Sequence, residues 1–387
     1  MQTYQKLLSE ELIRRGHRLT VISTRHPEDK EYEIQSGLEL YYLRDTTFGS
    51  KRKGWKAACL KKYIELDEIN SFDIIYSIST IIPKKLFAVA AEKKTPIILS
   101  SHGTGTMMLL SEIKQIFSQR RGRKNLFKII LLFIYYYLFM ELSLKKYDAI
   151  IAVSDEVAKS TLKWYFVERR KVYTVHNGVE TNLFRPDQEQ REHTRKALAI
   201  LNKEKVLLFF SVVTKQKGLH LLIKALPTIL KNNKCVKLMI IGEGEYLDEA
   251  RLMVEQSGLE DHAFFTGHIP REMASHYINA SDIFIMPTLR QEGLPFSLIE
   301  AMACQKPVIV SRIGGISSVI DDGINGLLIQ PGDVSKLAEK VIFLLDNKDF
   351  SDKLAKNGRD KVVQKFSLEH MVEGTIKVFE MTKKLME

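Results

Sequence analysis

Short apolar runs rich in β-branched residues alternate with longer segments of helical periodicity along the whole sequence. The runs that predict strands lie at residues 18–23, 38–43, 73–78, 96–101, 148–153, 171–175, 205–212, 236–242, 262–267, 282–287 and 306–311. Helical patterns follow most of these runs, and such alternation is typical of βαβ units with parallel sheets. The sequence therefore predicts an α/β protein.

The chain of 387 residues is long enough to form two separate hydrophobic cores. A polar stretch at 185–193 separates the strand runs of the first half from those of the second, and it is the expected domain junction. In two doubly wound domains, ligands bind beyond the carboxyl ends of the strands. The chemistry is therefore expected in the residues that directly follow each strand.

The net charge of +11 is distributed unevenly along the chain. Residues 1–180 carry 30 Lys and Arg against 20 Asp and Glu, whereas residues 181–387 carry 28 against 27. Two interpretations of the excess positive charge in the first half stay open. It forms a solvated basic surface, or it faces an anionic membrane or an acidic acceptor. Nucleic acid is not an expected partner, because no recognised binding module accompanies the charge.

The composition is that of an ordinary globular protein, with 45% hydrophobic and 27% charged residues. No run of 18 or more apolar residues predicts a membrane span, and the first residues lack the pattern of a secretory signal. The three cysteines are far apart and odd in number, which argues against a disulfide framework or a zinc site. A cytoplasmic location is expected.

The most specific pattern lies at 290–311, RQEGLPFSLIEAMACQKPVIVS. Glu292 falls in the connection after a predicted strand, Pro295 suits the first turn of a helix, and Glu300 lies about one turn into that helix. A helix N-terminus attracts anions such as a diphosphate, and two carboxylates there can accept hydrogen bonds from vicinal hydroxyls. The alternative interpretation is an N-terminal helix acid plus an exposed salt bridge.

The E-x(7)-E pattern, followed by A-M-A-C and P-V-I-V, resembles the signature of the family 4 retaining glycosyltransferases (glycosyl transferases group 1). Further segments resemble the family's motifs in the expected order along nearly the whole chain: 175–179 with Phe184, 241–244, 323–326 and 331–333. The resemblance implies the GT-B fold, in which two Rossmann-like doubly wound domains face each other across a cleft. The domains implied are an acceptor-side domain at 1–184, a nucleotide-sugar-binding domain at 185–366, and a C-terminal helix at 367–387 that returns toward the first domain.

The resemblance also implies roles for single residues. Glu300 matches the glutamate that binds the ribose of the nucleotide, and Glu292 matches the glutamate near the donor sugar. Lys217 matches the lysine that neutralises the donor diphosphate, and His102 matches a histidine that contacts the transferred sugar. Catalytic roles are thus expected for His102 and Glu292. The remaining donor-binding residues implied are Gly242, Gly244, Gly267, Gly293 and Leu294.

Taken alone, these residues have simpler interpretations. Lys217 is then a solvated loop lysine, His102 is a polar residue leaving a sheet, and Gly267 is part of a plain strand-to-helix turn. With the resemblance, Lys217 takes the role that a metal plays in other transferases, so neither a metal nor a cofactor is implied. The substrate implied is a nucleotide-diphosphate sugar, UDP- or GDP-linked.

The sequence departs from the family pattern at three places. Ser211 and Val212 stand where the family has Gly-Arg, so the arginine expected to clamp the diphosphate is absent, and Lys215 is its candidate substitute. The glutamate of the family's G-G-x-P-E motif is replaced by Ser318. The first residues match the family's first helix and second strand. The first domain is therefore expected to lack its central N-terminal strand, which leaves neighbouring strands unpaired.

Residues 120–146 combine a basic cluster with twelve successive apolar residues. The apolar run is too short to span a bilayer. Two interpretations stay open, a buried helix of the first domain and an interfacial helix whose basic residues contact anionic lipid. The second interpretation predicts a peripheral position on the inner face of the membrane.

The expected function is the transfer of a hexose-type sugar, with retention and without a metal, from a nucleotide-diphosphate sugar. The expected acceptor is a glycan, a lipid-linked sugar or a cell-surface polysaccharide precursor. Two alternatives remain from the sequence. One is another GT-B enzyme such as a sugar-nucleotide epimerase. The other is a degenerate, non-catalytic protein that binds a nucleotide sugar.

Overall fold

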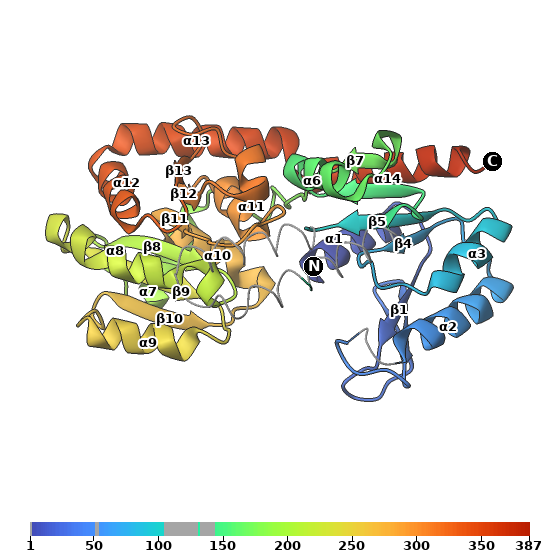
Figure 1. Cartoon of the computed structure of the whole chain (residues 1–387). Helices are drawn as coiled ribbons and strands as arrows, with labels where there is room; N and C mark the ends of the chain where they lie inside the picture. The colour runs from blue at the N-terminus through green and yellow to red at the C-terminus, as the bar shows by residue number, and fades with distance from the viewer. Residues whose placement is uncertain (1, 51–53, 104–130, 132–143) are drawn as a thin grey trace. The chain divides into compact units, whose positions relative to one another are not determined.

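The computed structural model describes residues 2–50, 54–103, 131 and 144–387. The chain divides into two compact units (Figure 1). Among the described residues, unit 1 holds those up to 103 together with 131, 144–176 and 369–387, and unit 2 holds 177–368. The division falls between His176 and Asn177, and the C-terminal helix belongs to unit 1 from Glu369 onward.

Unit 2 is built around a six-stranded, all-parallel sheet with the strand order β10-β9-β8-β11-β12-β13. Its strands are β8 (Lys205–Phe210), β9 (Val236–Ile241), β10 (Ala263–Gly267), β11 (Ile283–Met286), β12 (Val308–Ser311) and β13 (Leu327–Ile329). Its helices are α7 (Gln188–Ala197), α8 (Leu219–Asn232), α9 (Leu247–Gln256), α10 (Ala274–Ala280), α11 (Phe296–Ala303), α12 (Val334–Asp346) and α13 (Lys348–Lys365). The order reverses direction between β8 and β11, which is the switch point where doubly wound folds bind ligands.

The apolar runs of unit 2 form strands because both faces of the sheet are covered. Along β8, Val206 and Leu208 belong to one buried cluster, whereas Leu207 and Phe209 belong to the cluster on the other face. Successive side chains of a strand point to opposite faces, so a continuous apolar run supplies both cores at once. This explains why the strands of unit 2 do not alternate between apolar and polar residues.

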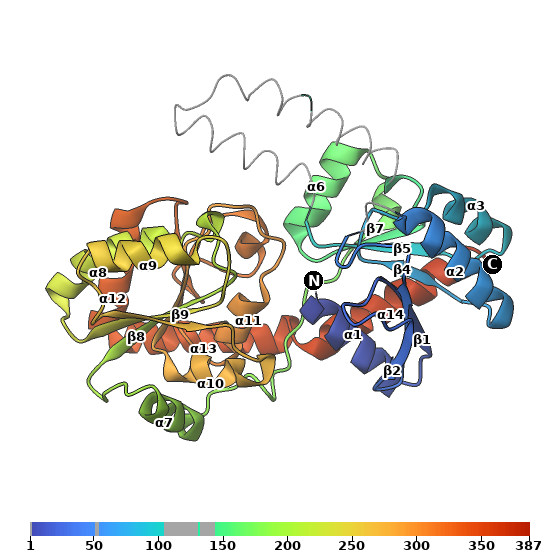
Figure 2. The same cartoon turned by 90° about the horizontal axis from the view of Figure 1, so that it is seen from below.

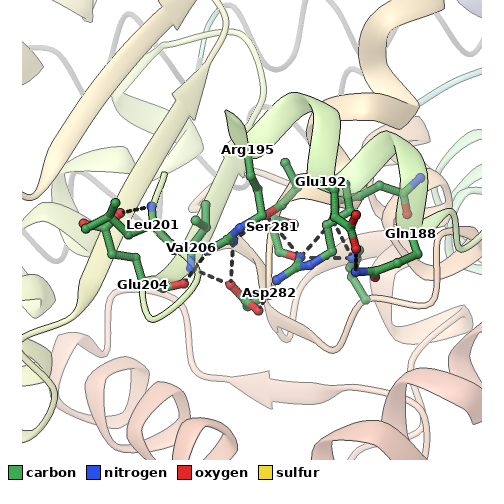
Figure 3. Close-up of polar contacts among 12 residues, drawn as sticks. Gln188, Glu192, Arg195, Leu201, Glu204, Val206, Ser281 and Asp282 are labelled. Atoms are coloured by element: carbon green, nitrogen blue, oxygen red, sulfur yellow. Dashed lines mark hydrogen bonds and ion pairs between the residues drawn. The ribbon is translucent and has the colours of Figure 1, made fainter. Parts of the chain in front are cut away.

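A buried ion-pair network joins α7 to the start of β8 and β11 (Figure 3). Asp282 accepts hydrogen bonds from Arg191 Nη2 at 2.8 Å, from the backbone N–H of Val206 at 2.7 Å and from Arg195 Nη1 at 3.5 Å. Arg195 is 5% exposed and also donates to the carbonyl oxygens of Ala280, Leu201 and Glu204. One carboxylate therefore pairs with two guanidinium groups at the entry to unit 2.

Asp282→Ala is expected to destabilise unit 2 by about 2–4 kcal/mol, because it leaves the buried Arg195 without its anion. Urea unfolding followed by circular dichroism measures the change. Asp352→Ala is the matched control, since Asp352 pairs with Lys348 on an exposed helix surface, where such pairs contribute little. Equal midpoints for the two variants would contradict a structural role for Asp282.

The described residues of unit 1 form two small sheets. The strands β4 (Ile75–Ser77), β5 (Ile97–Ser101), β6 (Ala149–Ala152) and β7 (Val172–Thr174) pair in parallel in the order β4-β5-β6-β7. The strands β1 (Leu19–Thr24), β2 (Tyr32–Gln35) and β3 (Leu38–Leu43) form the second sheet in the order β1-β3-β2. The helices of unit 1 are α1 (Gln2–Arg14), α2 (Trp55–Ile69), α3 (Lys84–Glu92), α6 (Asp155–Tyr165) and α14 (Leu368–Lys384), of which Leu368 itself is assigned to unit 2.

One edge each of β1 and β4 is unpaired among the described residues. Within the part of the chain that the structure describes, β1 pairs only with β3 and β4 only with β5, and five of the six residues of β1 are half-buried. The sequence predicted that the first domain lacks its central strand and that the neighbouring strands are left unpaired. The described residues show the unpaired edges, and the missing strand stays a prediction. Helices α1 and α14 lie side by side in this unit, where Arg15 pairs with Glu369 (Figure 2).

Among the described residues, the structure holds no helix that is long and apolar enough to cross a membrane. The apolar segment predicted at 120–146 lies outside the described residues, apart from Leu131 and residues 144–146. Its prediction as a membrane-contacting helix stays a prediction.

Candidate active site in unit 2

Two residues 75 positions apart meet at the switch point of the six-stranded sheet. Lys217 lies in the short 3-10 turn Lys215–Lys217 after β8, and Glu292 lies in the loop after the neighbouring strand β11. Lys217 Nζ donates to Glu292 Oε1 at 2.8 Å, and Thr288 Oγ1 donates to the same oxygen at 3.2 Å. Both charged side chains are largely buried. The sequence analysis named both residues, and the structure brings them into contact.

Two glycines hold the backbone of Glu292 in place. The N–H of Gly315 donates to the Glu292 carbonyl at 2.8 Å. At Gly314, whose φ is +57°, a Cβ atom would lie 2.4 Å from that carbonyl oxygen. Only glycine tolerates this approach. The Gly-Gly pair after β12 therefore still positions the backbone of Glu292, although the glutamate that follows this pair in the family is absent.

A second cation lies beside Glu292, and the sequence analysis did not predict it. Arg290 Nε is buried without a hydrogen-bond partner and lies 3.8 Å from Glu292 Oε1. Val212, which stands where the family has arginine, is 60% exposed. The expected substitute Lys215 instead places its Nζ 5.9 Å from the Tyr246 ring. Of these positions, only Arg290 brings an additional cation to the Lys217–Glu292 pair.

Glu300 lies in α11 and is 3% exposed. Arg271, in the turn Arg271–Met273 after β10, donates from Nη1 to Glu300 Oε1 at 2.7 Å and from Nη2 to Glu180 at 3.4 Å. The guanidinium also lies 5.5 Å from the Phe184 ring centre. Burial raises the pKa of Glu300, while the charge and hydrogen bond of Arg271 lower it. Arg271 is a further residue that the sequence analysis missed.

The predicted donor-binding glycines lie at strand ends of the same sheet. Gly242 follows β9 and donates its N–H to the carbonyl of Gly267, the last residue of β10, at 2.9 Å. Cβ atoms at Gly242 and Gly244 would lie 2.0 and 2.3 Å from the carbonyl oxygens of Ser211 and Val213. The turn after β9 therefore packs closely on the segment that follows β8.

Gly293 and Leu294 complete the predicted set between Glu292 and α11. The Leu294 side chain is 4% exposed and belongs to a core cluster, and its carbonyl accepts a hydrogen bond from Asn177 Nδ2 at 2.7 Å. Because that side chain is in the core, any contact of Leu294 with a ligand would come from its backbone.

His102, the predicted sugar-contacting histidine, lies in unit 1. It directly follows β5, where its Nε2 lies 3.2 Å from Ser100 Oγ and its ring packs edge-on against Tyr4 at 4.5 Å. The Tyr4 hydroxyl in turn lies 2.6 Å from that of Tyr76. Burial lowers the pKa of His102 to about 4. The ring is therefore neutral at pH 7 and offers a hydrogen bond, not a charge.

Comparisons with known proteins identify the class to which this fold and site belong. Residues 190–361 match the family model "Glycosyl transferases group 1", and residues 1–183 match "Glycosyltransferase Family 4". Together the two matches cover nearly the whole chain, which therefore belongs to the family 4 glycosyltransferases. This assignment decides against a sugar-nucleotide epimerase.

Similar proteins include transferases of known and unknown substrates. An uncharacterized glycosyltransferase of Methanocaldococcus jannaschii is 24% identical over 98% of this chain and 94% of its own length. A GDP-mannose-dependent alpha-(1-6)-phosphatidylinositol monomannoside mannosyltransferase of Mycobacterium tuberculosis is 32% identical, over 48% of this chain and 49% of its own.

Solved structures show the same GT-B fold. Sucrose-phosphate synthase from Thermosynechococcus elongatus superposes with a TM-score of 0.80 at 18% identity, over 99% of this chain and 93% of that one. HepE of Anabaena, solved in complex with UDP-glucose, superposes with a TM-score of 0.67 at 20% identity, over 90% of this chain and 86% of that one.

Proposed function

We propose that this glycosyltransferase moves a hexose-type sugar from a UDP- or GDP-linked donor to a glycan or lipid-linked acceptor, with retention of configuration and without a metal. The observation that carries the proposal is the Lys217–Glu292 contact at the switch point, with Arg290 beside it. The donors named for similar proteins, UDP-glucose and GDP-mannose, support a nucleotide sugar. A peripheral position on the inner face of the membrane, with contact through residues 120–146, is part of the same proposal.

In the proposed reaction, the bond between the sugar C1 and the diphosphate breaks, and its electron pair leaves on a phosphate oxygen. Lys217 and Arg290 supply positive charge for that leaving group, as a metal does in other transferases. The Glu292 carboxylate faces the positive charge that develops on the sugar ring. The neutral His102 provides a hydrogen bond to a sugar hydroxyl. An acceptor hydroxyl oxygen forms the new bond to C1, and its proton passes to the departing phosphate oxygen.

Saturation-transfer NMR of UDP- and GDP-sugars against the purified full chain tests the donor. Binding of one such donor, its turnover in the presence of a chelator, and an α-configured product from an α-configured donor would support the proposal. Failure to bind any nucleotide sugar would overturn it. Binding without turnover or hydrolysis would support the non-catalytic alternative instead.

Glu300→Gln is expected to raise the donor KM about tenfold with little change in kcat. If Glu300 accepts hydrogen bonds from the ribose hydroxyls, its contribution is the same in the ground state and in the transition state. Initial rates at varied donor concentration separate the two constants. A fall in kcat with an unchanged KM would place Glu300 at the reacting sugar and not at the ribose.

A further inference from the structure

Basic residues precede three neighbouring strands of the parallel sheet in unit 1. They form what we call the basic rim: Lys93 and Lys94 before β5, Lys145 and Lys146 before β6, and Arg169, Arg170 and Lys171 before β7. Six of the seven side chains are exposed, and Lys171 is half-buried. The same three connections, 92–96, 144–148 and 166–171, hold only three acidic residues.

The strand register places the basic rim on one edge of the unit. Ile98 pairs with Ala149 and Ile150 pairs with Val172, so the amino ends of β5, β6 and β7 lie next to one another. Lys171 Nζ also donates to the carbonyl of Tyr147 at 3.1 Å, which ties two of the connections together. Residues separated by more than 70 positions in the sequence therefore form one charged edge.

Large apolar side chains are exposed at this same edge. Phe166 is 64% exposed at the end of α6, within reach of Lys145, whose Nζ lies 5.9 Å from its ring centre. Leu385 is 71% exposed, and the neighbouring Lys383 pairs with Asp73 just before β4 at 2.5 Å. Single exposed apolar side chains are common on protein surfaces. Beside a cluster of basic side chains, however, they give this edge the composition of an interfacial surface.

Phe166 also has a backbone conformation that its side chain disfavours. Its φ and ψ are 47° and 37°, in the left-handed region at the end of α6, where glycine is the usual residue. Other residues adopt this conformation only at a cost. Neither burial nor backbone preference explains a phenylalanine at this position. We therefore expect its side chain to contact another molecule.

We infer that the basic rim and Phe166 form a docking surface for an anionic lipid bilayer. Lysine and arginine beside an anionic leaflet are attracted by its surface potential, and a projecting aromatic ring can enter the boundary between headgroups and acyl chains. The rim accounts for part of the positive charge that distinguishes the first half of the chain. A single-stranded nucleic acid would use the charge and could stack a base on Phe166, but it would leave Leu385 in water.

This surface is distinct from the sites already described. His102 follows β5 and so belongs to the carboxyl edge of the sheet, whereas the basic rim lies at the amino edge. The rim also contains only two residues, Lys145 and Lys146, of the segment 120–146 in which a membrane contact was predicted from the sequence. The donor site of unit 2 does not enter the inference.

Flotation of the full chain with phosphatidylcholine vesicles, with and without phosphatidylglycerol, tests the inference. Phe166→Gly removes the ring and places glycine in the left-handed conformation, which glycine adopts without strain. This variant is therefore expected to fold at least as well as the wild type. The double change Lys145→Glu/Lys146→Glu reverses charge on the rim. The matched controls lie in unit 2: Ala199→Gly, also at a positive φ of 52°, and Lys203→Glu/Lys205→Glu, at the amino end of β8.

The wild type and both controls are expected to float with anionic vesicles at low salt and to dissociate at high salt. Phe166→Gly and the rim double variant are each expected to bind about tenfold or more weakly. Binding of either rim variant at the wild-type level overturns the inference. A further double variant, Arg120→Glu/Arg121→Glu, changes basic residues outside the rim, and the inference is also overturned if this variant alone loses flotation. Binding of a single-stranded oligonucleotide with no flotation also overturns it. Donor binding measured by NMR stays unchanged in the rim variants, and its absence would count against the proposed function alone.

Discussion

Glu292→Gln is expected to lower kcat roughly ten- to a thousandfold, which corresponds to about 1.4–4 kcal/mol of transition-state stabilisation. The substitution keeps the size of the side chain but removes the charge that Lys217 contacts at 2.8 Å. Positive charge develops on the donor sugar only as its bond to the diphosphate breaks. The donor KM is therefore expected to change much less than kcat.

Lys217→Ala and the double variant Lys217→Ala/Glu292→Gln show whether Lys217 and Glu292 act together. Lys217 faces the diphosphate before and during its departure, so its loss is expected to raise KM and lower kcat. If the pair is one functional unit, the double variant loses less than the product of the single losses. Glu255→Gln, an exposed glutamate of α9, is the control and should stay within about twofold of the wild type. Wild-type rates in Glu292→Gln would contradict the site assignment.

The strands could be predicted from the sequence wherever an apolar run is long enough to stand out from its surroundings. All eleven predicted apolar runs overlap strands of the structure. In strands such as β5, β6 and β8 the run is continuous because parallel strands covered on both faces consist almost wholly of apolar residues. β2 was missed since its residues YEIQ are mostly exposed and it pairs antiparallel with β3 through a turn at Ser36 and Gly37. β13 was missed because three apolar residues after a loop do not stand out from their surroundings.

The site could be predicted only where a motif is local. Glu292 and Glu300 lie in one short segment, and Lys217 could be placed because Lys217-Gly218 after a predicted strand resembles the family's motif. Arg271 reaches Glu300 from the turn after β10, and nothing in the sequence near Arg271 indicates that this turn lies beside α11. Such contacts depend on the strand order, which periodicity does not determine.

Arg290 shows a different limit of sequence reasoning. It stands two positions before Glu292, within the segment that carried the prediction, yet it was not assigned a role. Lys215 is the cation nearest to Val212 along the chain and was therefore the predicted substitute for the missing arginine. Proximity to Glu292 instead comes from the loop after β11, which returns the Arg290 side chain toward the carboxylate.

Arg271→Met is expected to weaken donor binding strongly at neutral pH and to make it pH-dependent. Glu300 can accept hydrogen bonds from two ribose hydroxyls only when it is ionised. Arg271 is the cation that offsets its burial, whereas Glu180 raises the pKa of Glu300 further. Without Arg271 the carboxyl group titrates at a higher pH than in the wild type, so donor affinity should fall as the pH decreases through that range and recover as it increases.

The same substitution separates a positioning role from a loss of folding. A carboxyl group whose pKa is higher in the folded than in the unfolded state binds more protons when folded, so the free energy of unfolding of Arg271→Met falls as pH rises. Donor affinity changes in the opposite direction over the same range. Calorimetric titration of the donor, paired with urea unfolding between about pH 5 and 9, measures both. Glu180→Gln, which leaves the 2.7 Å contact between Arg271 and Glu300 in place and removes a charge that raises the pKa of Glu300, is the control and should show both trends more weakly than Arg271→Met. If affinity and stability of Arg271→Met fall together at every pH, Arg271 has only a structural role, and Glu300 does not bind the donor as an anion.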